Sequence, residues 1–313
     1  MKTDLTIHRR TILAGVAAWG TVTFLPYAAR AETHASDVFP SQNGVVEVSP
    51  ISHASFVLKT PFGVIFNDPV GDPSAYLGFP TPDLILITHE HGDHFNLGTL
   101  LAVVGPKTSL VTNPAVFAKL PAKLQAQATM IGNRETHETM GIGIEAIPAY
   151  NLTVGRRKFH PRGRDNGYIL TVDGLRIYIS GDTEDIPEMR ALKDIDLAFV
   201  CMNLPFTMDA EAAASAVSEF KPTYCYPYHY RGRDNGTQDP TDFADAVGKA
   251  VGIHTRNVGI PKGFNGLTTR KEKKLSLTMF VMGFTSNAPT TRRLPSGNPQ
   301  PQIRKFARQR QLQ

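Results

Sequence analysis

The 313-residue chain has little cysteine and little tryptophan: two cysteines, Cys201 and Cys225, and one tryptophan. Two cysteines cannot form a disulfide framework for a chain of this size, which excludes the small disulfide-stabilised folds of secreted domains. Both lie in apolar runs that are typical of strands, at 196–202 and 224–228. We therefore expect buried free thiols, although an oxidising compartment would permit a single bridge.

A basic core is also lacking, although the net charge of the whole chain is +5. Residues 1–31 carry four basic side chains and one acidic side chain, and residues 273–313 carry eight basic side chains and no acidic one. Residues 32–272 therefore have a net charge of −6. Because nucleic-acid binding needs clustered cations, this acidic core argues against a nucleic acid as partner.

Residues 1–31 are predicted to be an export signal. The run His8-Arg9-Arg10-Thr11-Ile12-Leu13 resembles a twin-arginine signal, and Ala29-Arg30-Ala31 offers the small residues of a cleavage site. A retained membrane anchor is the alternative, but Trp19 and Pro26 leave the span short and weakly apolar. We expect passage through the twin-arginine export machinery to the periplasm, with no stable membrane span after cleavage.

About 280 residues remain after this segment, enough for one α/β domain with a substantial core. We expect a flexible lead-in at 32–44, a single domain at 45–260, and a basic tail at 261–313. The end of that tail is rich in Pro, Gln and Arg. This composition predicts disorder.

Four potential metal ligands gather in one stretch, Thr88-His89-Glu90-His91-Gly92-Asp93-His94, which directly follows the apolar run 83–87. A short apolar run of this kind is typical of a buried strand. The crevice beyond the carboxyl end of a strand is where open α/β sheets bind ligands. The alternative, a polar helix start with a capping aspartate, would require three of only ten histidines to cluster by accident.

The spacing within the stretch predicts two ligand sets. His89 and His91 are two residues apart and point the same way in extended backbone. Asp93 and His94 follow the turn that Gly92 permits and face a second position. One loop can thus hold one or two metals, and imidazole with carboxylate favours Zn²⁺, with Mn²⁺ or Fe²⁺ as the other candidates.

This loop resembles the His-x-His-x-Asp-His signature of the metallo-β-lactamase superfamily of metal-dependent hydrolases. The resemblance implies an α/β fold, a four-layer αββα sandwich with two β-sheets packed face to face between helices. It also implies that a metal-bound hydroxide cleaves an ester, lactone or phosphoester bond of a small-molecule substrate.

Two later motifs resemble the remaining ligands of the superfamily. Ser180-Gly181-Asp182-Thr183 resembles its glycine-aspartate-threonine motif, whose carboxylate bridges two metals, and Pro227-Tyr228-His229-Tyr230 resembles the segment of the last ligand. The alternatives are a helix-capping turn and an aromatic core strand. The implied ligands are His89 and His91 for the first metal and Asp93, His94, Asp182 and His229 for the second. Asp93 and Asp182 would also orient the hydroxide.

A third histidine for the first metal is missing from its usual place. There the chain has Pro148-Ala149-Tyr150-Asn151, whose side chains are weaker ligands than imidazole. This segment followed by Phe159-His160-Pro161 resembles a group of uncharacterised hydrolases of the superfamily. His160 either fills the vacancy or is a surface histidine in the basic loop 156–164. Tyr150, Asn151 and His160 are candidate catalytic residues, and the loop itself is either solvated or meets an anionic substrate.

Further segments resemble one branch of the superfamily. His53 in Ser52-His53-Ala54-Ser55, and Asp68 before a proline, resemble residues that lie near the metals there; otherwise His53 is an ordinary strand histidine and Asp68 a turn former. Thr207-Met208-Asp209 resembles the branch that includes the L-ascorbate-6-phosphate lactonases. His53, like Tyr150 and His160, is a candidate for stabilising a developing oxyanion.

The sequence therefore predicts an exported metal-dependent hydrolase of a small substrate, and it is compatible with an oligomer. The first alternative is a non-catalytic periplasmic protein that binds metal or ligand in a degenerate site. The second is a phosphodiesterase that acts on lipid or nucleic acid.

Overall fold

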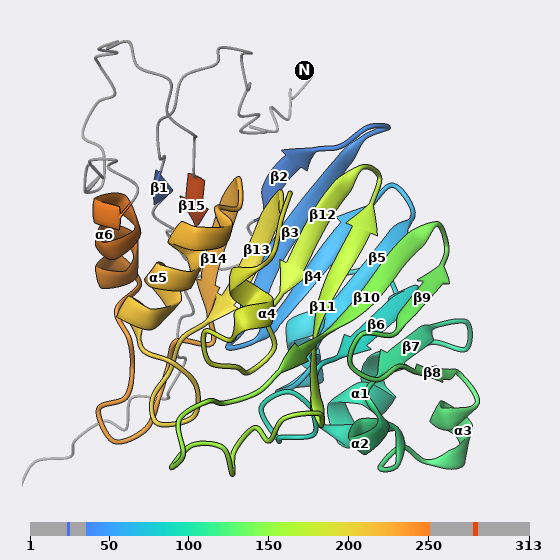
Figure 1. Ribbon diagram of the computed structural model, residues 1–313. Helices are drawn as coiled ribbons and strands as arrows, with labels where there is room; N and C mark the ends of the chain where they lie inside the picture. The colour runs from blue at the N-terminus through green and yellow to red at the C-terminus, as the bar shows by residue number, and fades with distance from the viewer. Residues whose placement is uncertain (1–23, 26–35, 251–277, 281–313) are drawn as a thin grey trace, which may run out of the picture.

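The computed structural model describes residues 24–25, 36–250 and 278–280 (Figure 1). Most of the predicted export signal and most of the basic tail lie outside these residues. Within the described part of the chain, no helix is both long and apolar enough to cross a membrane.

Two mixed β-sheets form the centre of the fold (Figure 1). The first sheet has seven strands in the order of the chain: β2 (Asp37–Pro40), β3 (Val45–Ser52), β4 (Ser55–Thr60), β5 (Gly63–Asn67), β6 (Leu84–Ile87), β7 (Ser109–Thr112) and β8 (Ala128–Met130). The second sheet has the order β1 (Phe24–Leu25), β15 (Thr278–Phe280), β14 (Tyr224–Tyr228), β13 (Leu197–Cys201), β12 (Leu175–Ile179), β11 (Asp165–Val172), β10 (Ile142–Ala149) and β9 (Thr136–Thr139).

Helices cover the outer face of each sheet (Figure 1). The first sheet is flanked by α1 (Leu97–Val103), α2 (Pro114–Phe117), α3 (Ala122–Gln125) and a short 3₁₀ helix, Pro73–Tyr76. The second sheet is flanked by α4 (Pro187–Arg190), α5 (Ala210–Phe220) and α6 (Pro240–Ala250). This arrangement confirms the predicted four-layer αββα sandwich.

Strand β6 shows why its sequence is apolar at every position. Leu84 and Leu86 belong to the core between the two sheets, whereas Ile85 and Ile87 pack under the helices α1 to α3. Since successive side chains of a strand point to opposite faces, a strand buried on both faces has no polar position. The strand therefore places the stretch that follows it at the edge of a rigid core.

Aromatic rings join the two sheets across the core. Phe56 of β4 stacks on Phe199 of β13 with ring centroids 4.0 Å apart, and Phe199 stacks on Tyr226 of β14 at 5.0 Å. Cys201 and Cys225 are buried free thiols in β13 and β14, as expected. The stacking of Phe56 on Phe199 packs the two sheets against each other.

The expected flexible lead-in contains an ordered strand instead. Residues Asp37–Pro40 form β2 and pair with β3 in antiparallel fashion. Phe39 is buried and contacts the ring of Tyr224 at a centroid distance of 4.9 Å. The Tyr226 hydroxyl donates a hydrogen bond of 2.7 Å to Asp37. The apolar burial of Phe39 and this hydrogen bond explain why the segment is ordered.

Candidate metal centre

The candidate ligands come from loops at one end of the two sheets. The stretch that carries His89 follows β6, Asp182 lies three residues after β12, and His229 directly follows β14. His53 lies in the turn between β3 and β4, and His160 lies in the loop between β10 and β11. The carboxyl ends of β6, β12 and β14 thus bring together motifs that are far apart in the sequence.

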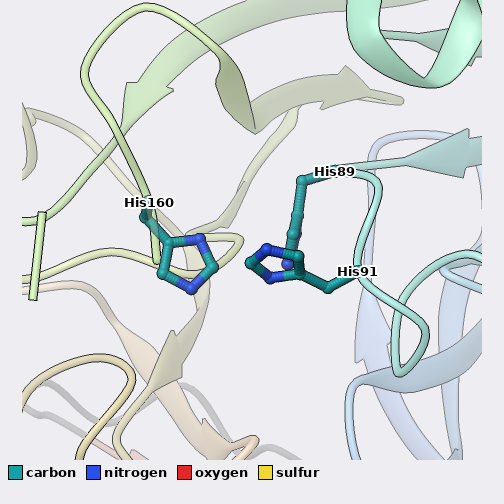
Figure 2. Close-up of side chains that lie close together, drawn as sticks. All are labelled: His89, His91 and His160. Carbon is teal, nitrogen blue, oxygen red and sulfur yellow. The ribbon is translucent and has the colours of Figure 1, made fainter. Parts of the chain in front are cut away.

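Three histidines form the first cluster. One ring nitrogen from each of His89, His91 and His160 lies within 4.8 Å of the others, and Figure 2 shows the rings pointing toward one another. Their ring centroids are 4.7 to 5.0 Å apart. The structure therefore places His160 where the first metal lacked a third imidazole.

Asp182 lies between this first cluster and a second cluster, which is formed by His94 and His229. Its Oδ2 is 3.3 Å from His160 Nε2 and 3.9 Å from His89 Nε2. Its Oδ1 is 3.3 Å from His94 Nε2 and 3.4 Å from His229 Nδ1. The two oxygens of one carboxylate thus face two different groups of histidines, the arrangement that a bridging ligand requires.

Asp93 lies beside the second cluster and contacts both His229 and His53. Its Oδ2 is 3.2 Å from His229 Nε2 and 3.4 Å from His53 Nε2. The rings of His53 and His229 lie 3.9 Å apart, and both residues have a φ of 51°. Positive φ strains a residue with a side chain, and such strain is concentrated at functional sites. His53 therefore lies beside the candidate ligands, as the resemblance implied.

Asp68 orients His94 from behind. Its carboxylate accepts hydrogen bonds from the Thr88 amide and hydroxyl, both 2.8 Å, and is 2.8 Å from His94 Nδ1. The Thr88 hydroxyl is also 3.1 Å from His89 Nδ1. Because that hydroxyl donates to Asp68, it accepts from His89 Nδ1–H, which leaves Nε2 of His89 as the free lone pair. Asp68 is itself buried with a φ of 42°.

Asp165 performs the same task for His160. Its Oδ2 is 2.9 Å from His160 Nδ1, and Arg164 donates hydrogen bonds of 2.7 and 2.9 Å to its two oxygens. A carboxylate that accepts the Nδ1 proton turns Nε2 toward a metal and makes it a stronger ligand. Sequence reasoning missed Asp165, although its position five residues after His160 was a usable signal.

The unpaired polar atoms of the site fit a metal. Five of the buried side-chain atoms that have no hydrogen-bond partner converge here: His89 Nε2, His94 Nε2, His160 Nε2, Asp182 Oδ1 and His229 Nδ1. Leaving a buried polar atom unpaired is costly, so such a cluster of orphans indicates a missing common partner. Nitrogen and carboxylate donors suit a divalent transition metal.

Electrostatics leaves His89, His229 and Asp182 ready for a cation, whereas His94 holds a proton that a metal would displace. Burial keeps the pKa of His89 well below its ordinary value and lowers the pKa of His229 to about 4, so both rings are neutral at pH 7 and offer a lone pair. Burial opposes ionisation of Asp182, but His229, His94 and His160 outweigh it and hold the pKa of this carboxyl well below its usual range. Burial would also lower the pKa of His94, yet Asp182 and Asp68 raise it well above normal.

Tyr150 and Asn151 do not join the candidate ligands. The Tyr150 hydroxyl donates a 2.9 Å hydrogen bond to Glu188, and the Asn151 amide donates to the carbonyls of Phe206 and Arg156 at 2.7 and 3.0 Å. These contacts turn both side chains toward the surrounding loops, and neither lines the cavity at the site. The structure thus gives them a role in holding the loops rather than a place beside the metal ligands.

The basic loop 156–164 is also engaged elsewhere. Arg156 pairs with Glu184 at 3.2 Å, Arg162 pairs with Glu188 at 3.4 Å, and Arg157 donates to a backbone carbonyl. Arg164 clamps Asp165 as described above. Most of the cations that were expected to meet an anionic substrate are therefore neutralised by the protein itself.

A cavity of about 590 Å³ opens over the two clusters. Its lining includes candidate ligands and their neighbours, namely His53, His91, Gly92, Asp93, His160 and Asp182. The rest of the lining consists of Phe159, Asn203, Phe206, Arg231, Gly232 and Arg233. Sequence reasoning missed this second group, because these residues converge only when separate loops pack together.

Comparison with known proteins agrees with this geometry. The model of the β-lactamase superfamily domain matches residues 47–229. A UPF0173 metal-dependent hydrolase of Pyrococcus abyssi is 30% identical over 214 residues, which are 65% of this chain and 93% of the relative. One of Pelotomaculum thermopropionicum is 29% identical and covers 67% of this chain and 96% of the relative.

A solved structure supports the same conclusion. The crystal structure of a putative metal-dependent hydrolase from Parabacteroides distasonis is 41% identical with a TM-score of 0.61, and the match covers 72% of this chain and 98% of that one. The metallo-hydrolase Igni18 of Ignicoccus hospitalis, 23% identical with a TM-score of 0.55, shares the fold. The matched region contains every candidate ligand from His89 to His229, and the chain belongs to the metallo-β-lactamase superfamily, in its UPF0173 family of metal-dependent hydrolases.

Proposed function

We propose that this metal-dependent hydrolase cleaves an ester, lactone or phosphoester bond of a small substrate at a centre for two Zn²⁺ ions. The observation that carries the proposal is the position of Asp182, whose two oxygens face His160 and His89 on one side and His94 and His229 on the other. Zinc fits a donor set of imidazole nitrogens and carboxylates. Lactones are included because residues 207–209 resemble the lactonase branch.

The residues divide into two groups of ligands. His89, His91 and His160 would hold the first ion. His94, His229 and Asp93 would hold the second ion, and Asp182 would contact both. A divalent ion in this position supplies a Lewis acid, which lowers the pKa of a bound water toward neutrality and polarises a substrate oxygen. Asp68 and Asp165 keep His94 and His160 in the orientation that exposes Nε2.

Asp93 and His53 would handle the proton and the substrate oxygen. Burial opposes ionisation of Asp93, but hydrogen bonds from His229 and His53 outweigh it and lower its pKa, so the carboxyl stays ionised and can accept a hydrogen bond from the attacking water. Its side chain is half-exposed and lines the cavity, where a substrate can reach it. His53 also lines the cavity and can donate a hydrogen bond to a developing oxyanion.

Hydrolysis of generic p-nitrophenyl esters and phosphodiesters by the purified protein tests the proposal. We expect hydrolysis that is lost with a chelator, restored by Zn²⁺, and lost in Asp182→Asn and His89→Ala. Asp194→Asn is the matched control, because Asp194 lies in an exposed turn with a φ of 54° that asparagine also adopts. Full activity in Asp182→Asn would refute the assignment of the centre.

The competing function is a binding protein without turnover. It is distinguished by metal-dependent thermal stabilisation on ligand addition without release of p-nitrophenol from any ester. The intact pairing of both histidine clusters with Asp182 favours the enzyme, since a degenerate site would lack one set of ligands.

The proposal places the enzyme in the periplasm, on the strength of the segment His8-Arg9-Arg10-Thr11-Ile12-Leu13. Cell fractionation should find the wild-type protein in the periplasm and shortened by about thirty residues, a length set by the small residues of the predicted cleavage site. Replacing Arg9 and Arg10 with lysine should retain the uncleaved precursor in the cytoplasm. Wild-type protein found uncleaved in the cytoplasm would contradict this part of the proposal.

A further inference from the structure

One hexapeptide, Arg-Gly-Arg-Asp-Asn-Gly, occurs twice in the chain, at residues 162–167 and 231–236. Each copy begins two residues after a candidate ligand, His160 in the first case and His229 in the second. The two copies differ in conformation and in contacts, and this difference indicates a separate role for the second copy.

The first copy is used within the protein. Its Asp165 holds His160 Nδ1 at 2.9 Å, and its Arg164 donates to Asp165 and to the carbonyl of Phe159 at 2.7 Å. From Asp165 onward the copy forms the start of strand β11 and pairs with β10. Both its acid and its second arginine are therefore engaged in positioning the metal ligand.

The second copy remains a loop. Asp234 and Asn235 have φ values of 51° and 65°, and His229 is oriented by Asp93 and Asp182 without Asp234. A Cβ atom would lie only 2.3 Å from the carbonyl oxygen of Leu204 if it were added to Gly232, and only 1.9 Å if it were added to Gly236. The loop therefore packs tightly against the backbone at Leu204. The loop is thus held in place by backbone contact, independently of its arginine side chains.

Both arginines of the second copy line the cavity over the candidate ligands. Arg233 is exposed, and its guanidinium carbon lies 5.9 Å from the ring centroid of Phe206. Among the ion pairs of the described residues, none involves Arg233, whereas Arg164 of the first copy pairs with Asp165 and Glu90. Phe206 in turn packs edge-to-face on Phe159 at 5.0 Å, and both rings line the same cavity.

We infer that Arg231 and Arg233 bind an oxyanion of the substrate, a carboxylate or a phosphate, while Phe159 and Phe206 contact an apolar part between this anion and the bond that is cleaved. The guanidinium group matches such oxyanions with paired hydrogen bonds. Both arginines line the cavity and neither is a candidate ligand, so the anion is a different group from the scissile bond. This inference rests on the proposed hydrolase function and narrows its substrate class.

Isothermal titration calorimetry tests the inference on the full-length protein, purified with its metal bound. Three non-hydrolysable anilides serve as ligands. These are hexanoic anilide, which is neutral, adipic monoanilide, which ends in a carboxylate, and 6-phosphooxyhexanoic anilide, which ends in a phosphate. We expect at least one anionic anilide to bind about tenfold more tightly than the neutral one. The more tightly bound of the two anionic anilides shows whether the substrate's oxyanion is a carboxylate or a phosphate.

Arg233→Gln and Arg231→Gln should each remove most of this preference without changing binding of the neutral anilide. Arg157→Gln is the matched control, since Arg157 is an exposed arginine of the first basic loop and lies outside the cavity. Equal binding of neutral and anionic anilides by the wild type would overturn the inference. So would an anion preference that survives in Arg233→Gln and Arg231→Gln, or one that only Arg157→Gln removes.

Hydrolysis of p-nitrophenyl hexanoate and mono-p-nitrophenyl adipate separates this inference from the proposed function. If neither ester is hydrolysed but the anion preference depends on Arg233, the oxyanion site stands and the hydrolase proposal fails. If both are hydrolysed equally, and Arg233→Gln changes neither KM nor kcat for the adipate, the hydrolase stands and the oxyanion site fails.

Discussion

His160 Nε2 lies 3.3 Å from Asp182 Oδ2, so the histidine of the β10–β11 loop meets the carboxylate that follows β12. Through this contact the first cluster has three imidazoles and a shared carboxylate, rather than two histidines alone. The same carboxylate reaches His94 with its other oxygen, which couples the two clusters.

The first prediction concerns the number of metals. Removing His160 should reduce the metal content from two equivalents per chain to about one, because the first cluster then keeps only two imidazoles beside a carboxylate that it shares with the second. Elemental analysis of His160→Ala purified without chelator measures this directly. His137→Ala is the control, since His137 lies in β9 away from both clusters and should leave the content unchanged. Two equivalents in His160→Ala would mean that another group completes the first cluster.

The second prediction concerns Asp68, which does not line the cavity over the candidate ligands but accepts a hydrogen bond from His94. Asp68→Asn should weaken binding of the second metal by about 10- to 100-fold, because the asparagine amide no longer fixes the His94 tautomer. Competition with a chromophoric chelator gives the affinity. Asp72→Asn is the matched control, as Asp72 is an exposed helix cap whose role asparagine also fills. Unchanged affinity in Asp68→Asn would show that His94 does not depend on this carboxylate.

The third prediction concerns Gly181, the residue before the bridging carboxylate. It has a φ of +60°, and a Cβ atom there would lie 2.6 Å from the carbonyl oxygen of Asn166. Gly181→Ala should lower the free energy of unfolding by about 3 kcal/mol, since both backbone strain and a clash with main chain oppose it. Gly155→Ala, where nothing lies within 4 Å of the added atom, should change stability by less than about 1 kcal/mol. Denaturant unfolding of both variants measures the difference, and equal stabilities would contradict the argument.

The fourth prediction is a pH dependence far from the metal centre. Burial raises the pKa of Asp37, and the hydrogen bond from Tyr226 only partly opposes this shift. The folded state therefore binds a proton that the unfolded state has already released, and stability falls as pH rises from the unfolded pKa through the raised value. Asp37→Asn keeps an acceptor for Tyr226 without this charge. It should be about 1 kcal/mol more stable than the wild type at pH 7 and show no such advantage below pH 4.

Denaturant unfolding at pH 4 and at pH 7 checks the sign of this effect. A stability difference between Asp37→Asn and wild type that grows as the pH falls would be the opposite of the expected result. Asp83→Asn is unsuitable as a control because Asp83 accepts a backbone hydrogen bond that starts β5. Asp194→Asn serves instead, because it removes one negative charge at an exposed position.

An element of the fold could be predicted from the sequence where the residues that stabilise it lie within or next to the element itself. Strand β6 was recognisable because a strand buried on both faces must be apolar throughout. Helix α5 likewise has a local cause, since Asp209 caps its start by accepting a hydrogen bond from the Ala212 amide. Strand β2 was missed because Phe39 finds its partners, Tyr224 and Tyr226, nearly two hundred residues later in the chain.

The sequence by itself determined the candidate ligands of the loop after β6, because four donors within six residues leave the chain little freedom to separate them. It also determined the fold class through the motifs that the superfamily shares. Only the tertiary structure decided between the readings of His160, placed Tyr150 and Asn151 away from the clusters, and separated the two copies of the hexapeptide. Those outcomes depend on which loops meet at one end of the two sheets, and identical hexapeptides have different roles there because their surroundings differ.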